Sequence, residues 1–381
     1  MRPTWAEINL AAIAHNVKLL AQLAQPAKLC AVVKANGYGH GIIPVARTAI
    51  HAGADMLAVA LVEEGAQLRE AGLQTPILML SEPTPNQFGE VVELGLTPTI
   101  YQLEGLAAAN AAAAKAKVSL PVHLKIDTGM ARVGASAKDA VSLANAIVAH
   151  ETLDLAGVWT HCAMADSPDH PFTAQQIQRF NQIIAELTAA GHNNFCAHLA
   201  NSAACMANPE SRLNMVRCGI SVYGIAPSRA LEGCVALKSA MTIRTKVSMV
   251  KQIPAGTAVS YGHHYTATHD TQLASIPIGY ADGLPRCLGL TGGEVLIGGQ
   301  RRPIAGVVTM DQTMVDCGTE HLVAVGDEVV LLGKQGNHEI TATEIADHVD
   351  TIAYEIITRL GPRLPLHFTK HPYTTATSDL N

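Results

Sequence analysis

A lysine at the end of an apolar run is the first residue whose type and position suit a catalytic role. Residues 28–35 read KLCAVVKA, which is typical of a buried strand, and the glycine-rich stretch NGYGHG follows Lys34 and Ala35. Burial lowers the pKa of a lysine and frees its amine to act as a nucleophile or a base. A surface lysine would instead extend its charge into water. The glycines favour a ligand-binding site over a surface lysine, because they let a ligand approach the backbone.

Polar residues follow the later apolar runs in the same way. Lys125 closes a run at 121–127, Arg132 lies in the loop behind it, and His161 closes a run at 155–161. Taken singly, each is as well explained by ordinary strand-end chemistry. Together they place two amines, a guanidinium and an imidazole at the ends of apolar strands.

A third group follows the last two apolar runs. Ser202 comes just after the run at 194–200, and Arg217, Gly219 and Ile220 come at the end of the run at 213–219. A hydroxyl and backbone N–H groups at such positions are suited to a phosphate. A lysine able to form a Schiff base, a phosphate site and an arginine between them suggest pyridoxal phosphate.

The elements that must position these residues alternate regularly. Eight apolar runs, separated by amphipathic or alanine-rich segments, lie at 28–35, 55–60, 76–80, 96–100, 121–127, 155–161, 194–200 and 213–219. Continuous apolar strands that alternate with helices indicate a parallel sheet covered by helices. Eight of them fit a (β/α)8 barrel of ~250 residues, in which functional residues share the carboxyl ends of the strands. An open doubly wound sheet is the rival, but no GxGxxG follows the first run.

The pattern changes after about residue 235. Alternating strands joined by glycine, proline and aspartate turns replace the strand–helix alternation, and this indicates an antiparallel sheet. A short helix at 342–349 and a last helix or strand at 351–360 close the chain. We therefore predict an α/β chain of two domains, a barrel over 1–235 and a mainly antiparallel β-domain over 236–381.

The composition excludes several classes of protein. Twenty-six lysines and arginines against 32 aspartates and glutamates give a net charge of −6, so nucleic acid and anionic membranes are poor partners. No window approaches ~20 consecutive apolar residues, and the N-terminus lacks a secretory signal. The eight cysteines form no CxxC pair and the 17 histidines no HExxH. We expect a cytoplasmic protein with reduced thiols and without a metal site.

The same residues carry a resemblance to a known family. The stretch AVVKANGYGHG around Lys34 resembles the cofactor-lysine signature of the alanine racemases. The resemblance covers nearly the whole chain and includes KIDTGMARVG (125–134), THCAMAD (160–166), ANSAA (200–204), MVRCGISVYG (215–224), VSYGHHY (259–265), PIGYADGLPR (277–286), VTMDQTMVD (308–316) and DTIAYEIITRLGPRLP (350–365). The family's barrel followed by a β-domain is also the order that the strand pattern predicts.

The resemblance implies that pyridoxal phosphate and two bases interconvert L-alanine and D-alanine. Lys34 would bind the cofactor covalently and act as one base, and Tyr261 would be the other. In the family this tyrosine comes from a second subunit, so a homodimer with shared active sites is implied. Arg217 would bind the pyridine nitrogen, and His161 would lie between Arg217 and Tyr261. Such an enzyme would supply D-alanine for peptidoglycan.

The resemblance assigns further residues to the cofactor and the substrate. Those expected to hold the cofactor phosphate are Tyr38, Ser202, Gly219, Ile220 and Tyr354. Arg132 would reach the cofactor's phenolic oxygen and the substrate carboxylate, and Lys125, carbamylated in some members, would orient it. Met310 and Asp311 from the partner would line the substrate pocket, with Tyr280 in the entry corridor.

Three positions depart from the family's commonest pattern. Gly37 stands where alanine is frequent, Thr309 where a cysteine often precedes the Met-Asp pair, and Ala353 where asparagine is often seen. A racemase of serine or of a broader range of amino acids stays open, because a hydrophobic pocket rejects an added hydroxyl only weakly. A non-catalytic pyridoxal-phosphate protein would resemble the barrel alone. A decarboxylase of the same architecture would need a cysteine-bearing loop, which Thr309 does not support.

Overall fold

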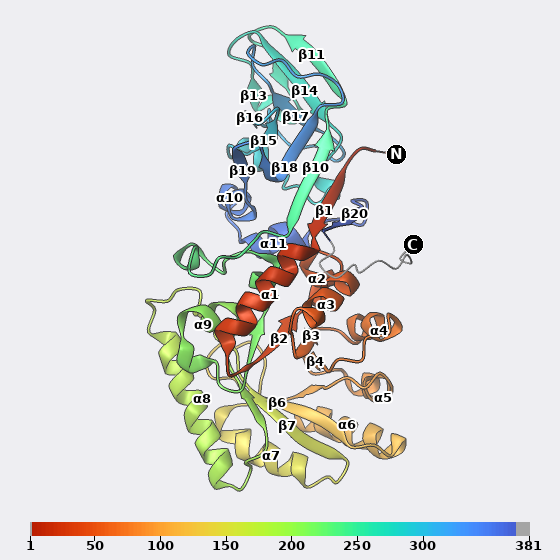
Figure 1. The fold of residues 1–381 in the computed structure, drawn as a ribbon, viewed down its shortest axis with the longest axis vertical. Coiled ribbons are helices and arrows are strands. Elements are labelled where there is room, and N and C mark those ends of the chain that lie inside the picture. Colours follow the sequence, from red (N-terminus) through yellow and green to blue (C-terminus); the bar gives the residue numbers. More distant parts are fainter. Residues whose placement is uncertain (1, 371–381) are drawn as a thin grey trace. The chain divides into compact units, whose positions relative to one another are not determined.

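The computed structural model describes residues 2–370, which form two compact units (Figure 1). One unit consists of residues 12–37 and 41–238, and the other joins residues 2–11, 38–40 and 239–370. Each unit has its own sheets and its own buried residues. None of the helices in the described residues is long and apolar enough to cross a membrane.

Eight parallel strands make up the centre of the first unit. They are β2 (Lys28–Val32), β3 (Met56–Val59), β4 (Ile77–Met79), β5 (Thr99–Ile100), β6 (Leu120–Lys125), β7 (Leu153–Trp159), β8 (Cys196–His198) and β9 (Met215–Cys218). They pair in two sheets of order β4-β3-β2-β9 and β5-β6-β7-β8. Each strand lies within or beside one of the eight apolar runs, so the sequence predicts their number and order correctly.

Two further connections close these sheets into a barrel. A parallel bridge between Leu78 and Thr97 joins the β4 and β5 segments. On the other side, Arg217 N donates to Ala200 O at 2.9 Å, which joins the β9 segment to the chain after β8. With both seams joined, the predicted (β/α)8 barrel is confirmed.

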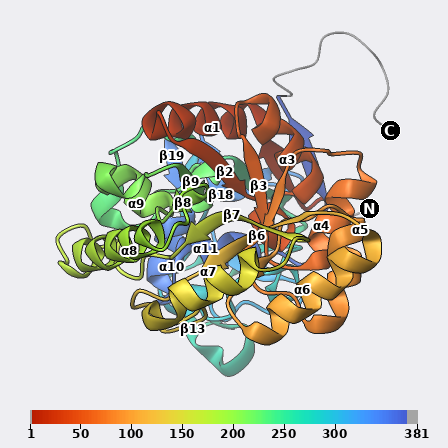
Figure 2. The ribbon, with the colours of Figure 1, turned by 90° about the horizontal axis from the view of Figure 1, so that it is seen from below.

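Helices surround the barrel strands, as Figure 2 shows for α3 to α8. The helices are α1 (Leu10–Ala24), α3 (Ile42–His51), α4 (Val62–Glu70), α5 (Phe88–Glu93), α6 (Leu103–Ala116), α7 (Ala140–Val148), α8 (Phe172–Ala189) and α9 (Ser202–Ala207). Their apolar residues recur every three or four positions, as in α8, which buries Ile177, Phe180 and Ile183. This spacing gives each helix one apolar face to cover the strands.

The second unit is built mainly from antiparallel strands. They are β1 (Trp5–Asn9), β10 (Met241–Lys246), β11 (Met249–Ile253), β12 (Ala258–Val259), β13 (Tyr265–Thr266), β14 (Thr271–Ile276), β15 (Glu294–Ile297), β16 (Gln300–Pro303), β17 (Thr313–Asp316), β18 (Glu328–Gln335), β19 (His338–Ile340) and β20 (Leu366–Thr369). The largest sheet has the order β16-β15-β18-β10-β1-β20, and β11-β14-β17 form a second. Two helices, α10 (Ala342–His348) and α11 (Ala353–Thr358), lie near the end of the unit.

Strand β1 is the element whose place differs most from the predicted division at residue 235. Its neighbours are β10, which is antiparallel to it, and β20, which is parallel. Ala6 and Ile8 alternate with half-buried residues and are fully buried. Residues 2–11 therefore group with the C-terminal half of the chain. The segment at 351–360, which the sequence predicts as a helix or a strand, contains the helix α11.

Candidate active site

Lys34 lies directly behind the first barrel strand, where the backbone turns with the opposite hand to a normal helix. Ala35, Asn36 and Gly37 have φ values of 53°, 52° and 60°. Left-handed backbone costs a residue other than glycine roughly 1–2 kcal/mol. Two of these three residues are not glycine, so the turn must be held by contacts with the surrounding chain.

Glu64 on α4 provides the main contacts that hold this turn. Its Oε1 accepts a hydrogen bond from Ala35 N at 2.6 Å, and its Oε2 accepts from Ala60 N at 2.8 Å and Leu61 N at 3.2 Å. Within the turn, Asn36 Oδ1 accepts from Ile42 N at 2.9 Å. One carboxylate therefore ties the residue after Lys34 to the start of α4.

Burial and charge both act on the Lys34 amine. Burial is the larger effect and lowers the pKa of Lys34, and the positive charge of Arg132 lowers it further, while Glu64 acts in the opposite direction. A lower pKa increases the fraction of neutral amine, which is the form able to act as a base or nucleophile. Arg132 itself lies exposed in the loop behind β6.

Arg217 on β9 is the most deeply buried cation of the barrel, with 3% of its surface exposed. The two N–H groups of its Nη2 are shared among three acceptors, Thr160 O at 2.8 Å, Leu199 O at 3.1 Å and His161 Nδ1 at 3.2 Å. The guanidinium also lies 4.5 Å from the ring centroid of Trp159. Burial lowers the pKa of Arg217 to about 10, which leaves it cationic at neutral pH.

The contact with Arg217 determines which nitrogen of His161 carries a proton. A guanidinium has donors and no acceptor, so His161 Nδ1 must be unprotonated and must accept. Burial first, and then the charge of Arg217, lower the pKa of His161 well below its ordinary value. The imidazole is therefore neutral, with its proton on Nε2.

Lys125 ends β6 and, like Arg217, lies against the ring of Trp159. Its Nζ lies 4.2 Å from the Trp159 ring centroid, and the residue is 4% exposed. Burial, Arg217, Arg132 and Lys34 together lower the pKa of Lys125 to about 7. Near neutral pH a large fraction of this amine is therefore uncharged.

Ser202, Gly219 and Ile220 are brought together where β8 and β9 end. Asn201 caps α9 by accepting a hydrogen bond from Ala204 N at 2.9 Å, and Ser202 is the first residue of that helix. Gly219 N donates to Ser202 Oγ at 2.9 Å. Ile220 begins a 3-10 helix over Ile220–Tyr223. The predicted phosphate residues of the barrel unit thus share one region at two helix N-termini.

The remaining predicted residues belong to the second unit, and most are exposed. Tyr261 begins a 3-10 helix (Tyr261–His263) and is 73% exposed, and Met310 is 52% exposed. Tyr280 N donates to Thr309 O at 3.0 Å, and Ala281 N donates to Met310 O at 3.1 Å. These bonds bring the Tyr280 and Met310 loops together.

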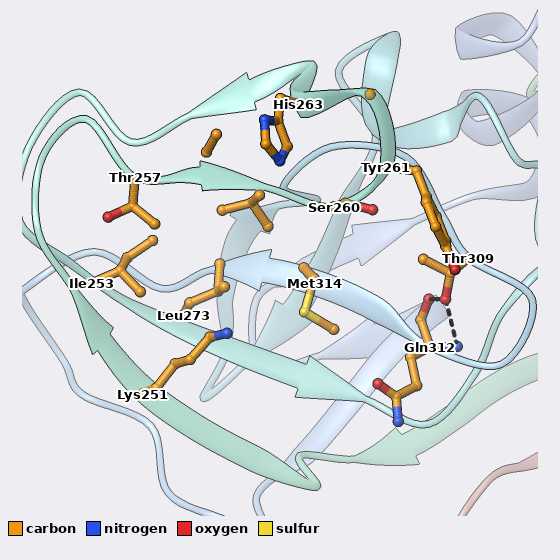
Figure 3. Close-up of a pocket in the computed structure, with 13 residues that line it drawn as sticks. Lys251, Ile253, Thr257, Ser260, Tyr261, His263, Leu273, Thr309, Gln312 and Met314 are labelled. Atoms are coloured by element: carbon orange, nitrogen blue, oxygen red, sulfur yellow. Dashed lines mark hydrogen bonds between the residues drawn. The ribbon is translucent and has the colours of Figure 1, made fainter.

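A cavity of about 480 Å³ adjoins these loops within the second unit (Figure 3). Tyr261, Thr309 and Gln312 line it together with Lys251 and Met314. Thr309 Oγ1 donates to Gln312 O at 2.8 Å, which fixes the loop between them. Thr309, which departs from the family's common residue, therefore lies in the same cavity as Tyr261.

Tyr38 and Tyr354 also lie together in the second unit. Their ring centroids are 6.3 Å apart with planes inclined by 48°. A Cβ atom added to Gly39 would lie 2.1 Å from Ile357 O on α11. The missing side chain of Gly39 thus lets the segment around Tyr38 approach the helix that carries Tyr354.

Sequence reasoning missed several residues that support these groups. They are Glu64, His123, Trp159, His198, Asp282 and Arg363. Asp282 is fully buried and accepts hydrogen bonds from Arg2, Arg363 and Gly279 N. Arg363 also donates to Asp311 at 2.7 Å. None of these residues gives a local signal, and Glu64 gives none because Leu61, three residues before it at the N-cap, has no side-chain acceptor for a capping box.

The closed barrel, with amines and guanidinium groups at its strand ends, and the β-domain that follows it define a barrel enzyme whose site lies at the carboxyl ends of the strands. Models of the alanine racemase N-terminal and C-terminal domains match residues 8–227 and 240–368. The chain belongs to the alanine racemase family, and it is an enzyme of the amino-acid isomerase class.

Individual relatives resemble the chain over almost its full length. The alanine racemase of Symbiobacterium thermophilum is 46% identical over 365 residues, 96% of this chain and 97% of that protein. The crystal structure of alanine racemase from D-cycloserine-producing Streptomyces lavendulae is 40% identical with a TM-score of 0.92, and the match covers 97% of this chain and 98% of that one. The Bartonella henselae alanine racemase, solved with covalently bound pyridoxal phosphate, is 27% identical with a TM-score of 0.88, over 97% and 100% of the two chains.

Proposed function

We propose that the protein interconverts L-alanine and D-alanine with pyridoxal 5′-phosphate bound through Lys34. The observation that carries this proposal is the group of Lys34, Lys125, Arg132, His161 and Arg217 at the barrel strand ends, where burial first, and then the four cations, lower the pKa of His161. Both family models match, including the one for the β-domain, which disfavours a non-catalytic protein that resembles the barrel alone.

The residues present fit this cofactor. Ser202, Gly219 and Ile220 supply a hydroxyl and the starts of two helices, which suit a phosphate. Tyr38 and Tyr354 are the further phosphate ligands that we propose. Lys34 has an amine whose pKa is lowered by burial, as a lysine that attacks a carbonyl requires. Arg217, donating from a fixed guanidinium, would bind the pyridine nitrogen.

When bound, pyridoxal phosphate withdraws electrons from the substrate and makes its Cα–H bond acidic. The chain's own residues then have to move the proton. Lys34 would take it from one face of Cα or return it there, and the partner's Tyr261 would do the same on the opposite face. Two bases are simpler than one that would have to cross the substrate.

His161 would connect Arg217 to the partner's Tyr261. Its Nδ1 accepts from Arg217, so Nε2–H is the group that remains to donate to a phenolate oxygen. Arg217 cannot give up its proton at neutral pH, so a pyridine nitrogen that it bound would stay largely unprotonated. This restrains electron withdrawal and favours proton return over transamination.

Arg132, Lys125 and the loops of the β-domain would select the substrate. Arg132 would bind the substrate carboxylate, with Lys125, carbamylated or not, orienting it. Met310 and Asp311 would line the partner's pocket and Tyr280 its entry. We therefore propose that the domain at 236–381 serves the neighbouring barrel in a homodimer. The exposure of Tyr261 and Met310 in the single chain supports a role toward a second subunit.

The biological setting follows from this reaction. We propose a cytoplasmic enzyme that supplies D-alanine for peptidoglycan. Serine is the second candidate substrate, because Thr309 replaces the family's common cysteine in the cavity that Tyr261 lines, and one hydroxyl changes selectivity only modestly in an apolar pocket.

Proton NMR in heavy water tests the reaction directly. Purified protein, pyridoxal phosphate and L-alanine should lose the α-proton signal and give D-alanine in a chiral assay. The same experiment with L-serine measures the substrate range. Absence of exchange with alanine, in a sample whose absorbance shows bound cofactor, would overturn the assignment of alanine as substrate.

A further inference from the structure

Two buried histidines continue the hydrogen-bond chain on a second side of Arg217. Arg217 Nη1 donates to His198 Nδ1 at 2.7 Å, and His198 Nε2 lies 2.9 Å from His123 Nδ1. His198 and His123 are 0% and 4% exposed. They lie on β8 and β6, so three strands contribute to one chain of polar groups inside the barrel.

The donor-only guanidinium determines the tautomers of both rings. His198 Nδ1 accepts from Arg217, so the His198 proton is on Nε2. That N–H can only donate to His123, so His123 Nδ1 is the acceptor. Burial first, and then the charge of Arg217, lower the pKa of His123 to about 3 and that of His198 well below its ordinary value. Both rings are neutral.

Close packing fixes the positions of the two rings. His198 stacks on Trp159 with centroids 5.7 Å apart and planes inclined by 10°. His123 lies against Gly157 of β7, where an added Cβ would come within 2.4 Å of His123 Nδ1. Trp159 Nε1 donates to Thr99 Oγ1 at 3.2 Å. The imidazoles therefore have little freedom to turn away from Arg217.

The acceptors around Arg217 have a chemical property in common. Those that it contacts within residues 2–370 are two carbonyl oxygens and two neutral imidazoles, and none is a carboxylate. A buried cation is usually paired with an anion. Here the hydrogen bonds from Nη1 and Nη2 all go to neutral acceptors, so within the described residues they give the positive charge no anionic partner.

We propose that His198 and His123 are a positioning pair for Arg217, which fixes the guanidinium through neutral acceptors and preserves its full charge at the active site. The inference rests on the proposed function in one respect, namely that Arg217 faces the cofactor. Neither histidine is a catalytic residue in this proposal, because both act through Arg217.

The tautomers can be measured on the wild-type holoenzyme. Long-range proton–nitrogen NMR of protein labelled with ¹⁵N-histidine distinguishes Nδ1–H, Nε2–H and doubly protonated rings, and His198→Asn and His123→Leu assign the signals. We expect neutral Nε2–H rings for both residues across pH 6–8. An Nδ1–H tautomer or an imidazolium at either position would overturn the proposal, whether or not the protein racemises alanine.

Substitutions of His198 test the positioning role. His198→Leu removes the acceptor, and because a buried charged donor left without a partner is costly, kcat should fall roughly tenfold to a hundredfold with little change in KM. His198→Asn keeps an oxygen near the place of Nδ1 and should recover most of kcat. His192→Leu, which alters a histidine bound to Asn145 in the same unit, is the matched control and should leave kcat unchanged.

A second readout separates positioning from a merely structural role. Arg217, Arg132, Lys34 and Asp127 are the charged groups that act on Lys125. If Arg217 moves, the midpoint of the Lys125 ¹³Cε NMR titration should rise in His198→Leu and stay near the wild-type value in His198→Asn. Equal midpoints and equal kcat in all three proteins would overturn the positioning role. Correct tautomers in a protein that binds pyridoxal phosphate but does not racemise would overturn the proposed function alone.

Discussion

The two units hold their site residues in opposite ways. In the barrel unit, Arg217 and Lys125 are buried beside Trp159, and the Lys34 turn is held by Glu64. In the other unit, Tyr261 and Met310 are largely exposed. The difference shows that the barrel unit holds its site residues in place with side chains of its own. The second unit fixes the backbone of its loops through bonds such as Tyr280 N to Thr309 O and holds Asp311 through Arg363, but it presents Tyr261 and Met310 outward.

The largest expected effect comes from removing the two proposed bases. Lys34→Ala and Tyr261→Phe should each lower kcat at least about a thousandfold, because general acid–base groups contribute up to roughly 10⁴. Mixing the two inactive proteins under conditions of subunit exchange should restore activity, since one site of each heterodimer would be intact. Mass spectrometry verifies that subunits have exchanged. If activity is not recovered after exchange, the active sites are not shared, and the exposure of Tyr261 no longer supports a role toward a second subunit.

Reversal of the charge at Arg217 should have the next largest effect. Arg217→Glu would protonate the pyridine nitrogen, so we expect stronger long-wavelength absorbance of the bound cofactor, more transamination and a kcat lower by roughly a hundredfold. Stopped-flow spectra and pyruvate assays measure these changes. Arg212→Glu, which alters a less buried arginine of the same unit, is the control. An unchanged spectrum and an unchanged product profile would contradict the proposed role of Arg217.

The pKa of Lys125 tests how strongly burial and the neighbouring cations of the barrel act on a buried amine. An NMR titration should give a midpoint near 7, against 10.5 for an unperturbed lysine. Between these values the unfolded chain binds more protons than the folded one, so stability rises with pH over this range. Lys125→Met should therefore stabilise the fold most below pH 7 and remove part of this slope. Urea unfolding from pH 6 to 10 measures it, with the exposed Lys138→Met as control; equal slopes in all three proteins would speak against a buried, depressed amine.

The smallest expected effect concerns the turn behind Lys34. Glu64→Gln keeps one oxygen acceptor but loses the second and the charge, so the free energy of unfolding should fall by about 1 kcal/mol. Because Glu64 opposes the other effects on Lys34, its loss should also lower the pH at which the Lys34 amine titrates. Chemical unfolding reports the first change, and the pH dependence of the rate at which cofactor-free protein takes up pyridoxal phosphate reports the second. Glu63→Gln, at the neighbouring exposed position, should change neither the free energy of unfolding nor the titration of Lys34. Identical behaviour of the two variants would show that Glu64 does not hold the Lys34 turn.

The sequence predicted the barrel well because its signal is local. Each strand is a short apolar run, and the barrel geometry places whatever follows those runs on one face. Lys34, Lys125, His161 and Arg217 could be found from this rule alone. The roles of Tyr261 and Met310 could not, since they lie in exposed loops without local signal and were assigned through the resemblance.

The parts that were missed depend on partners far away in the chain. His198 and His123 lie inside strands and read as ordinary buried residues until their contact with Arg217 is known. The left-handed φ of Ala35 has no signal either, because alanine avoids that conformation. Strand β1 has the right alternation for a strand, but its neighbours lie more than 230 residues further along the chain.

The pairing of β1 bears on how the protein emerges during synthesis. This strand leaves the ribosome well before its two neighbours, since β10 follows only at Met241 and β20 only at Leu366. Its place between β10 and β20 is completed by almost the last described residues, and non-local pairing of this kind is slow to form. Until then Ala6 and Ile8 lie on a strand with open edges, which invites pairing with other chains. A chain that stops before residue 366 would keep one of these edges permanently.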